Sequence, residues 1–491
     1  MTGTRGEEMT APRARAELAV TVDRSISTPL AVQIASNLRT AILDGRLRAG
    51  ARLPSWMDLA AQLGVARGTI KAAYDALADE QLVVPSGAAG TRVALRAAPG
   101  PIDVRRIEIL SPRRDLDRGT SLRPLPFQMG VPAQDGFPAK LWARLRTRAV
   151  RVNAVMPVGP PNSRGEPELR AEIAAHLAIT RRISCHPDQI VLTGGYRNGL
   201  CLTMLALQAA GRSAWIEDPC CPATRMAVKM AGLCPVPIPV DAKGLRVDHG
   251  VRAAPHAAVA IVTPGQHAPT GATLSAERRA ALLGWAIRED AWLVEDDTLG
   301  ALQLSCRASP ALAAQDPEGR VIHVGSFAST VSPAIGLGYV VAPLQLARRF
   351  AEVADCLNPA PNATTQLALA DFLRQGHFLR HLRHMKRLYK ERRQAMLARL
   401  DPALRIEAAG GLTAIVRLPR CADDVALAHR APELGIAPSP LSIWSSDPAK
   451  ARQGFVLSVT NLHRELLDSA CDALLRLIES APCQVMEARA A

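Results

Sequence analysis

Residues 59–77 read L-A-A-Q-L-G-V-A-R-G-T-I-K-A-A-Y-D-A-L, two apolar stretches on either side of a glycine. Both stretches repeat apolar residues at the spacing of one helix face, first Leu59, Ala60 and Leu63, then Ile70, Ala73, Tyr74 and Leu77. Gly64 supplies the turn between them. Two short helices joined by such a turn have the spacing of a helix-turn-helix, whose second helix enters the major groove of DNA. The stretch therefore predicts a DNA-binding unit.

The residues on either side extend this unit. Pro29–Asp44 carries an apolar helical stripe that Gly45 ends. A short apolar run at 82–84, turn residues at 85–87 and the segment 90–93 predict a two-stranded wing. We therefore expect a winged helix-turn-helix domain, mainly α-helical, over residues 29–94, preceded by a flexible segment at 1–28.

The charge of the chain favours an anionic partner. Its 59 Lys and Arg outnumber 45 Asp and Glu, a formal net charge of +14, which attracts nucleic acid. Residues 29–94 hold only seven basic and five acidic side chains, so most of the excess lies elsewhere. The chain begins without a secretory signal and has no run of about 18 apolar residues. The sequence therefore predicts a cytoplasmic protein without a membrane segment.

The rest of the chain predicts at least one further domain, because 491 residues exceed the roughly 250–300 that one hydrophobic core holds. Residues 95–125 are rich in Pro, Arg and Asp with little apolar periodicity, which predicts a linker. Beyond it, short apolar runs alternate with helical stretches, at 189–193, 214–217, 258–263, 291–295 and 321–326. This alternation predicts a parallel sheet covered by helices, with ligands near the strand ends.

Over residues 29–94 the chain resembles the winged helix of the GntR family of regulators. The motifs are P-L-x-x-Q-I at 29–34, G-x-L-x-x-G-x-R-L-P-S at 45–55, L-G-V-x-R-x-T-I at 63–70 and A-Y-x-x-L at 73–77. The resemblance implies that residues near the start of the second helix, and others on the wing, meet phosphates or base edges. The residues expected to contact DNA are Ser55, Arg67, Thr69, Lys71, Thr91 and Arg92. One departure is Trp56-Met57, where the family carries Ser-Arg, and it removes a phosphate contact.

The remainder resembles the aminotransferase-like body of the MocR group of GntR regulators. G-S-F-A-S-T-V at 325–331, then Pro333 and L-G-Y at 337–339, match that group's G-T-F-S-K-T-L…P…R-L-G-Y block. Five further motifs occur in the family's order, at 164–170, 217–219, 269–271, 295–297 and 376–381. The resemblance implies the fold type I architecture of pyridoxal-phosphate (PLP) enzymes, with a large α/β domain at 126–402 and a smaller α/β subdomain at 403–491.

The same resemblance marks substitutions in the cofactor site. In register, Ser329 stands where the group has the lysine that bonds PLP, and Gly336 where it has an arginine for the phosphate. Thr298 replaces a tyrosine and Cys221 an aromatic residue. A serine hydroxyl cannot form an imine, and none of the seven lysines falls within 244–385. The remnants of the cofactor pocket are Gly195, Tyr196, Arg197, Asp296, Ser326 and Ser329.

We therefore expect no catalytic residue and no covalent cofactor, with non-covalent PLP as the less favoured alternative. By the resemblance, Asp296 would face the pyridine nitrogen, and the amides of 195–197 with the Ser326 hydroxyl would meet the phosphate. Two other constellations suggest metal ligands, His377/His381/His384 on one helix face and Glu295-Asp296-Asp297. Basic neighbours in the first and alternating strand faces in the second argue against both, so no metal site is predicted.

These features predict a sequence-specific transcription regulator that acts on double-stranded operator DNA. The resemblance implies a homodimer and leaves open a small-molecule effector, namely an amino acid, an amine or a vitamer. The alternative function is a PLP-binding or PLP-dependent aminotransferase-type enzyme with an appended DNA-binding domain.

Overall fold

The chain forms two compact units, residues 1–111 and 112–491, in the computed structural model. The structure describes residues 20–87, 90–95, 124–154, 159, 161–304, 310–358, 360, 362–400, 402–404, 406–407, 410–447 and 451–481. Most of the expected linker, residues 96–123, lies outside the described residues, as do residues 1–19 of the expected N-terminal segment. No described helix is long and apolar enough to cross a membrane.

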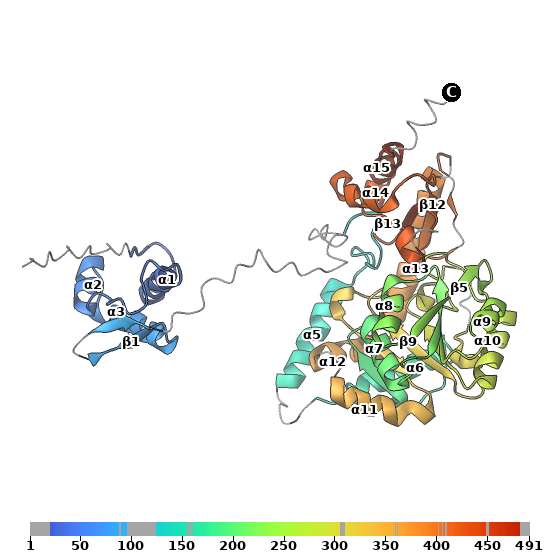
Figure 1. Ribbon diagram of the computed structural model, residues 1–491, viewed down its shortest axis with the longest axis horizontal. Coiled ribbons are helices and arrows are strands. Elements are labelled where there is room, and N and C mark those ends of the chain that lie inside the picture. Colours follow the sequence, from blue (N-terminus) through green and yellow to red (C-terminus); the bar gives the residue numbers. More distant parts are fainter. Residues whose placement is uncertain are drawn as a thin grey trace, which may run out of the picture. The chain divides into compact units, whose positions relative to one another are not determined.

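The first unit is a three-helix domain with a two-stranded wing (Figure 1). Its elements are α1 (Leu30–Leu43), α2 (Trp56–Leu63), α3 (Arg67–Asp79), β1 (Val83–Pro85) and β2 (Thr91–Val93). The apolar stripes expected from the sequence meet in one core, in which Ile34, Leu59 and Leu77 are fully buried. Gly64 ends α2 in the left-handed conformation, with φ +61°, as the turn requires.

The second unit is built on an eight-stranded sheet in the order β3-β10-β9-β8-β7-β4-β5-β6. The strands are β3 (Ile190–Thr193), β4 (Ser213–Asp218), β5 (Cys234–Asp241), β6 (Gly244–Leu245), β7 (Val259–Val262), β8 (Trp292–Asp296), β9 (Val321–Ser326) and β10 (Gly338–Val341). The five central strands, β9, β8, β7, β4 and β5 in spatial order, are parallel. Strand β10 runs antiparallel to both of its neighbours, and β6 to β5.

Helices cover both faces of this sheet (Figure 1). One face packs against α7 (Tyr196–Leu207), α8 (Pro222–Met230) and α11 (Ala347–Leu357). The other packs against α5 (Ala139–Ala154), α6 (Pro167–Thr180), α9 (Val247–Ala253), α10 (Ala276–Arg288), α12 (Ala363–Arg374) and α13 (His377–Leu400). Under α10, the fully buried rings of Trp215 and Trp285 stack with centroids 3.8 Å apart. The covered sheet is the architecture that strand and helix alternation predicted.

The C-terminal residues form a smaller α/β subdomain. Its antiparallel sheet has the order β11-β12-β14-β13. The elements are β11 (Ile406–Glu407), β12 (Thr413–Arg417), α14 (Asp424–Arg430), β13 (Ser439–Pro440), β14 (Gly454–Ser458) and α15 (Leu467–Glu479). Helix α13 leads into it, and a single apolar core continues from the large domain to Phe455 and Leu474. The predicted fold class, a winged helix joined to an aminotransferase-like body with a smaller subdomain, is confirmed.

Candidate functional site

Helix α3 presents the basic face that a recognition helix requires. Its inner face, including Ile70, is buried, whereas the side chains of Arg67 and Lys71 are exposed. Residues four apart on a helix lie on the same side, so these two cations share one surface. Thr69, between them in the sequence, is half-buried. The N-cap Ala66 makes no side-chain hydrogen bond to the first turn, where the Thr69 amide donates to the Ala66 carbonyl at 2.9 Å.

Ser55, which the sequence predicts to contact DNA, is the N-cap residue of α2. The Ser55 hydroxyl accepts a hydrogen bond from the Asp58 amide at 3.1 Å, as an N-cap does. The next two residues, Trp56 and Met57, are about half exposed, at 49% and 54%. An aromatic and an aliphatic side chain therefore occupy the surface where the family carries a serine and an arginine.

The wing holds the two remaining residues expected to contact DNA. Arg92 is exposed on β2, and its Nη1 donates a hydrogen bond to the Gly50 carbonyl at 3.0 Å. Thr91 precedes it and is half-buried. This bond holds Nη1 of the Arg92 guanidinium near Gly50. The N–H groups on Nε and Nη2 can still donate to another partner.

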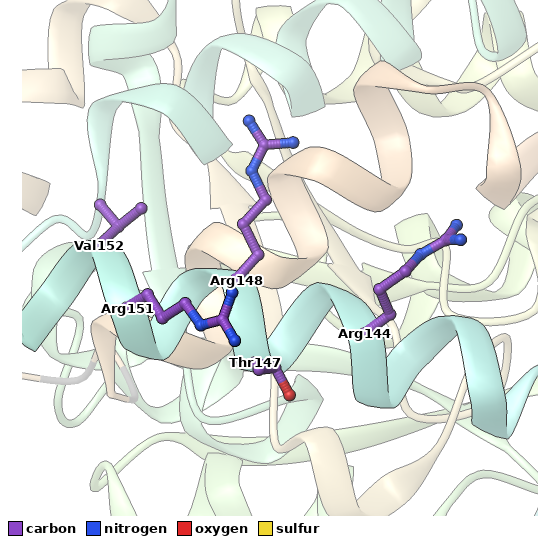
Figure 2. A pocket seen from close by; sticks show the side chains of 5 residues that line it. All are labelled: Arg144, Thr147, Arg148, Arg151 and Val152. Carbon is purple, nitrogen blue, oxygen red and sulfur yellow. The ribbon is translucent and has the colours of Figure 1, made fainter.

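A second basic surface lies on the body, along α5. This helix of 16 residues has five basic residues and no acidic one. Figure 2 shows Arg144, Arg148 and Arg151 on α5, beside a shallow groove of about 780 Å³. Arg148 Nε lies 3.6 Å from a carboxylate oxygen of Asp371. The sequence reasoning missed this surface, although the run of arginines in residues 139–154 could have revealed it. Such density of positive charge favours phosphates or acidic side chains as partners.

The cofactor-pocket remnants meet at one edge of the large sheet. Strand pairing puts Gly338, the first residue of β10, beside both Thr193 at the end of β3 and Ser326 at the end of β9. Gly338 must be a glycine, because a Cβ there would lie 2.8 Å from the Cα of Gly195. Strand β8, which ends at Asp296, runs parallel to β9. The carboxyl ends of β3, β8 and β9 therefore bring Gly195, Asp296 and Ser326 to the same edge, where ligands bind in open α/β sheets.

At this edge the Tyr196 side chain lies between Thr224 and Asp296. Tyr196 is the first residue of α7, and its hydroxyl lies 3.0 Å from the Thr224 hydroxyl on α8. It also bonds to the carboxylate of Asp296. Burial raises the pKa of Tyr196 well above its ordinary value, and the charge of Asp296 adds to this. The phenol ring thus spans the space between the start of α7 and the end of β8.

One carboxylate oxygen of Asp296, Oδ1, is held by Thr298. It accepts hydrogen bonds from the amide of Thr298 at 3.0 Å and from its hydroxyl at 2.7 Å. Burial raises the pKa of Asp296, while the bonds from Thr298 and Tyr196 oppose that rise. The sequence pointed to Asp296 but not to the hydroxyls of Tyr196, Thr224 and Thr298 around it.

The other remnants are separate from this network. Arg197 is exposed, and the Ser326 hydroxyl accepts a hydrogen bond from the Ala328 amide at 3.2 Å. Ser329 follows in the turn after β9 and is half-buried. Gly336 has φ +58°, a conformation that disfavours any residue with a side chain. The backbone at 336 is thus suited to the glycine, whereas an arginine would be strained there.

Glu295 and Asp297 face away from Asp296, as alternation along a strand requires. Glu295 Oε2 lies 3.0 Å from Nδ1 of the buried His323, and Asp297 pairs with buried Arg181 at 2.6 Å. Burial opposes ionisation of Glu295, but hydrogen bonds from His323 and the Leu312 amide prevail and lower its pKa. In the histidine set, His381 instead bonds to the Thr330 carbonyl at 2.8 Å. Among the described residues, no three potential metal ligands gather in one group.

A buried acid that the sequence reasoning did not single out lies next to this edge. Glu217, near the end of β4, accepts hydrogen bonds from the amide and the hydroxyl of Thr263. Burial raises the pKa of Glu217 to about 7, and the bonds from Thr263 only partly offset this. His267 Nε2 lies 3.6 Å from it, and burial lowers the pKa of His267 to about 4. Both groups are therefore neutral between about pH 4 and pH 7.

This burial predicts a pH dependence of stability. Because the folded-state pKa of Glu217 is above the unfolded value of about 4.3, the folded body binds an additional proton between the two. The stability that this proton contributes is complete below pH 4 and is lost as the pH rises through 7. From pH 5 to pH 8 we expect the wild type to lose about 2–3 kcal/mol of unfolding free energy that Glu217→Gln, which has no carboxylate to ionise, keeps. Urea unfolding of the body at the two pH values measures this difference. An equal pH dependence in both proteins would contradict the assignment.

Comparison with known proteins bears on both units. Residues 30–93 match the family of bacterial regulatory proteins, gntR family, and residues 159–474 match aminotransferase class I and II. The chain is 33% identical to the probable rhizopine catabolism regulatory protein MocR of Rhizobium meliloti, over 96% of this chain and 99% of that protein. The chain belongs to the MocR-type regulators.

Two further comparisons concern a second regulator and the fold of the body. The pyridoxine biosynthesis transcriptional regulator PdxR of Corynebacterium glutamicum is 33% identical over 77% of this chain and 80% of that protein. The fold of the body is that of an archaeal alanine:glyoxylate aminotransferase, with a TM-score of 0.68 at 23% identity over 75% of this chain and 93% of that chain. The MocR-type relatives are named transcription regulators, so regulation of transcription is the shared function.

Proposed function

We propose that this MocR-type regulator binds a specific operator through its winged helix at 29–94, and that its body no longer uses PLP as a covalent cofactor. The observation that carries the proposal is the contrast between the two sites. The cations of α3, Arg67 and Lys71, are exposed, whereas the pocket at the sheet edge holds the chain's own phenol. A linker at 95–125 would then join the DNA-binding domain to a body that starts at 126.

The residues present do not fit a covalently held PLP. Bonding its aldehyde requires a primary amine, and Ser329 offers a hydroxyl at the position where the MocR group carries lysine. The phosphate would lack an arginine because position 336 is glycine. A charge-assisted hydrogen bond contributes roughly 1.5–3 kcal/mol, so this loss alone weakens PLP binding about tenfold to hundredfold.

Tyr196 supports the same conclusion from the side of the ring. A pyridine ring seated on Asp296 would compete for its carboxylate with Thr298 and Tyr196. It would also need the space that the phenol spans between α7 and β8. Binding of PLP would therefore require the phenol to move out and would break its hydrogen bonds to Thr224 and Asp296.

The contacts with DNA follow from the surface of the first unit. We assign Arg67 and Lys71 to base edges or phosphates of the major groove, and Arg92 to the DNA backbone beside the wing. The Ser55 hydroxyl acts as a helix cap, so its contribution is to hold the start of α2. The body provides the dimer contact that lets two winged helices read repeated half-sites in the cytoplasm. The names of the relatives refer to different pathways, so none of their target genes is assigned to this chain.

A selection from random duplex DNA tests the regulator. We expect the full-length protein at moderate salt to enrich a motif with repeated half-sites, against excess non-specific competitor. Recovery of a random pool after several rounds would overturn the proposal.

A second experiment tests the alternative function, a PLP-dependent enzyme. The retained Asp296 is the observation that favours this alternative. The protein is incubated with PLP, treated with borohydride and analysed by peptide mass. We expect no adduct. An adduct on a native lysine, for example Lys386, whose pKa burial lowers, would establish covalent PLP chemistry.

A further inference from the structure

A cavity of about 320 Å³ lies in the body where the large domain meets the smaller subdomain. We call it the junction cavity. Three parts of the chain enclose it: the β7–α10 loop with Gln266, helix α13 with Lys390 and Arg393, and the glycines 410–411 that lead into β12. Its size is at the lower end of the roughly 300–1,000 Å³ typical of small-molecule sites.

Gln266 gives this cavity a polar group. Only 8% of the residue is exposed, and it is one of the residues that line the cavity. The backbone of Gly411 lies against the carboxamide, since a Cβ at 411 would be 2.5 Å from the amide carbon. A carboxamide has an NH2 group with two donors and an acceptor oxygen, so Gln266 can bind a polar molecule that enters the cavity.

The charge of the cavity selects an anion. Lys390, Arg393 and Gln394 lie three and four residues apart on α13, so they share one helix face. Of the described residues that line the cavity, none is Asp or Glu. A guanidinium and an ammonium beside amide donors match the oxygens of a carboxylate or a phosphate.

We infer that the junction cavity is a binding site for a small organic anion that carries carboxylate or phosphate groups. Gln266 and Gln394 donate hydrogen bonds to the anion, and Lys390 and Arg393 supply the positive charge. This site is distinct from the pocket around Tyr196 and Asp296, and binding to it does not depend on the proposed DNA-binding function.

Thermal unfolding of the full-length protein tests the site with three probes. Glutarate and inorganic phosphate are the anions, and glutaramide is the uncharged counterpart of glutarate. We expect the anions to raise the melting temperature of the body by on the order of 2 °C at ten times Kd, and glutaramide to have no effect. The preferred anion distinguishes a carboxylate site from a phosphate site. Equal responses to glutarate and glutaramide, or no response to either anion up to 50 mM, would overturn the inference.

Three variants separate binding from folding. Lys390→Gln removes an exposed charge, so it is expected to fold normally and to lose at least half of the anion response. Lys229→Gln on α8 is the matched control, exposed and outside the cavity, and should respond as the wild type does. Gln266→Leu removes the carboxamide and keeps a side chain of similar size, so we expect the anion response to be lost. A Gln266→Leu protein that keeps the full response would contradict the site.

Discussion

The double variant Arg67→Gln/Lys71→Gln is expected to lose operator binding by about 100-fold or more. Both side chains are exposed on α3 and lie on the same side of the helix. A side chain that binds a base edge with two hydrogen bonds contributes roughly 1–3 kcal/mol, and the two losses combine. If one contact is to a phosphate, the slope of log affinity against log salt also falls by about 0.9. Fluorescence anisotropy with the selected operator at several salt concentrations measures both quantities.

A control is needed because the variant also removes two positive charges from a basic protein. Lys229→Gln/Arg420→Gln removes two exposed charges from the body and should bind the operator within about twofold of the wild type. Circular dichroism should show that all proteins are folded, since neither Arg67 nor Lys71 contributes to the buried core of the first unit. Wild-type affinity in Arg67→Gln/Lys71→Gln would show that α3 is not the recognition helix.

We expect two substitutions together to restore covalent binding of PLP to the body. Ser329→Lys supplies an amine after β9, and Tyr196→Ser removes the phenol from the space in front of Asp296. The double variant should form an adduct with PLP that borohydride fixes at position 329. Ser329→Lys alone should form little, because the ring still fills the pocket. Tyr196→Ser alone should bind PLP only reversibly, because no amine is present.

A Tyr196→Phe variant distinguishes the effect of the ring volume of Tyr196 from the effect of its hydroxyl group. Tyr196→Phe/Ser329→Lys keeps the ring volume but loses the bonds to Thr224 and Asp296. We expect this variant to resemble Ser329→Lys alone, since volume excludes the cofactor. An equally high yield of adduct in the Tyr196→Phe and Tyr196→Ser backgrounds would show that the ring does not close the pocket. Peptide mapping identifies position 329 against the native lysines.

The elements with strong periodicity could be predicted from the sequence. The buried strands from β3 to β9 that carry Val, Ile and Leu were expected within one or two residues, because a strand covered on both faces is continuously apolar. Strand β5 was not expected, since Pro235, Pro237 and Pro239 lack amide donors. These prolines alternate, and the amide of Cys234, just before the first of them, bonds to the Arg212 carbonyl before β4 at 2.9 Å. Pairing with β4 therefore uses amide donors of the other residues of β5 and none of the prolines.

The site was predicted less completely than the fold. Sequence motifs identified Asp296, Ser329 and Arg67, because each lies within a recognisable pattern. Tyr196 was expected to contribute only its amide, and the position of its side chain depends on Thr224, which lies 28 residues away. The junction cavity brings together segments more than 100 residues apart, such as Gln266 and Lys390. Contacts between such distant segments leave no periodic signal in a single sequence.

The exposed Trp56 has a practical consequence for these experiments. It is the only tryptophan in the first unit, and the other five belong to the body, including the stacked Trp215 and Trp285. An indole in contact with water emits at longer wavelength and is accessible to iodide, whereas the stacked pair is shielded. Fluorescence at the red edge of the spectrum is therefore weighted toward Trp56 at the start of α2. Duplex DNA that covers this helix would protect Trp56 from quenching without any attached dye.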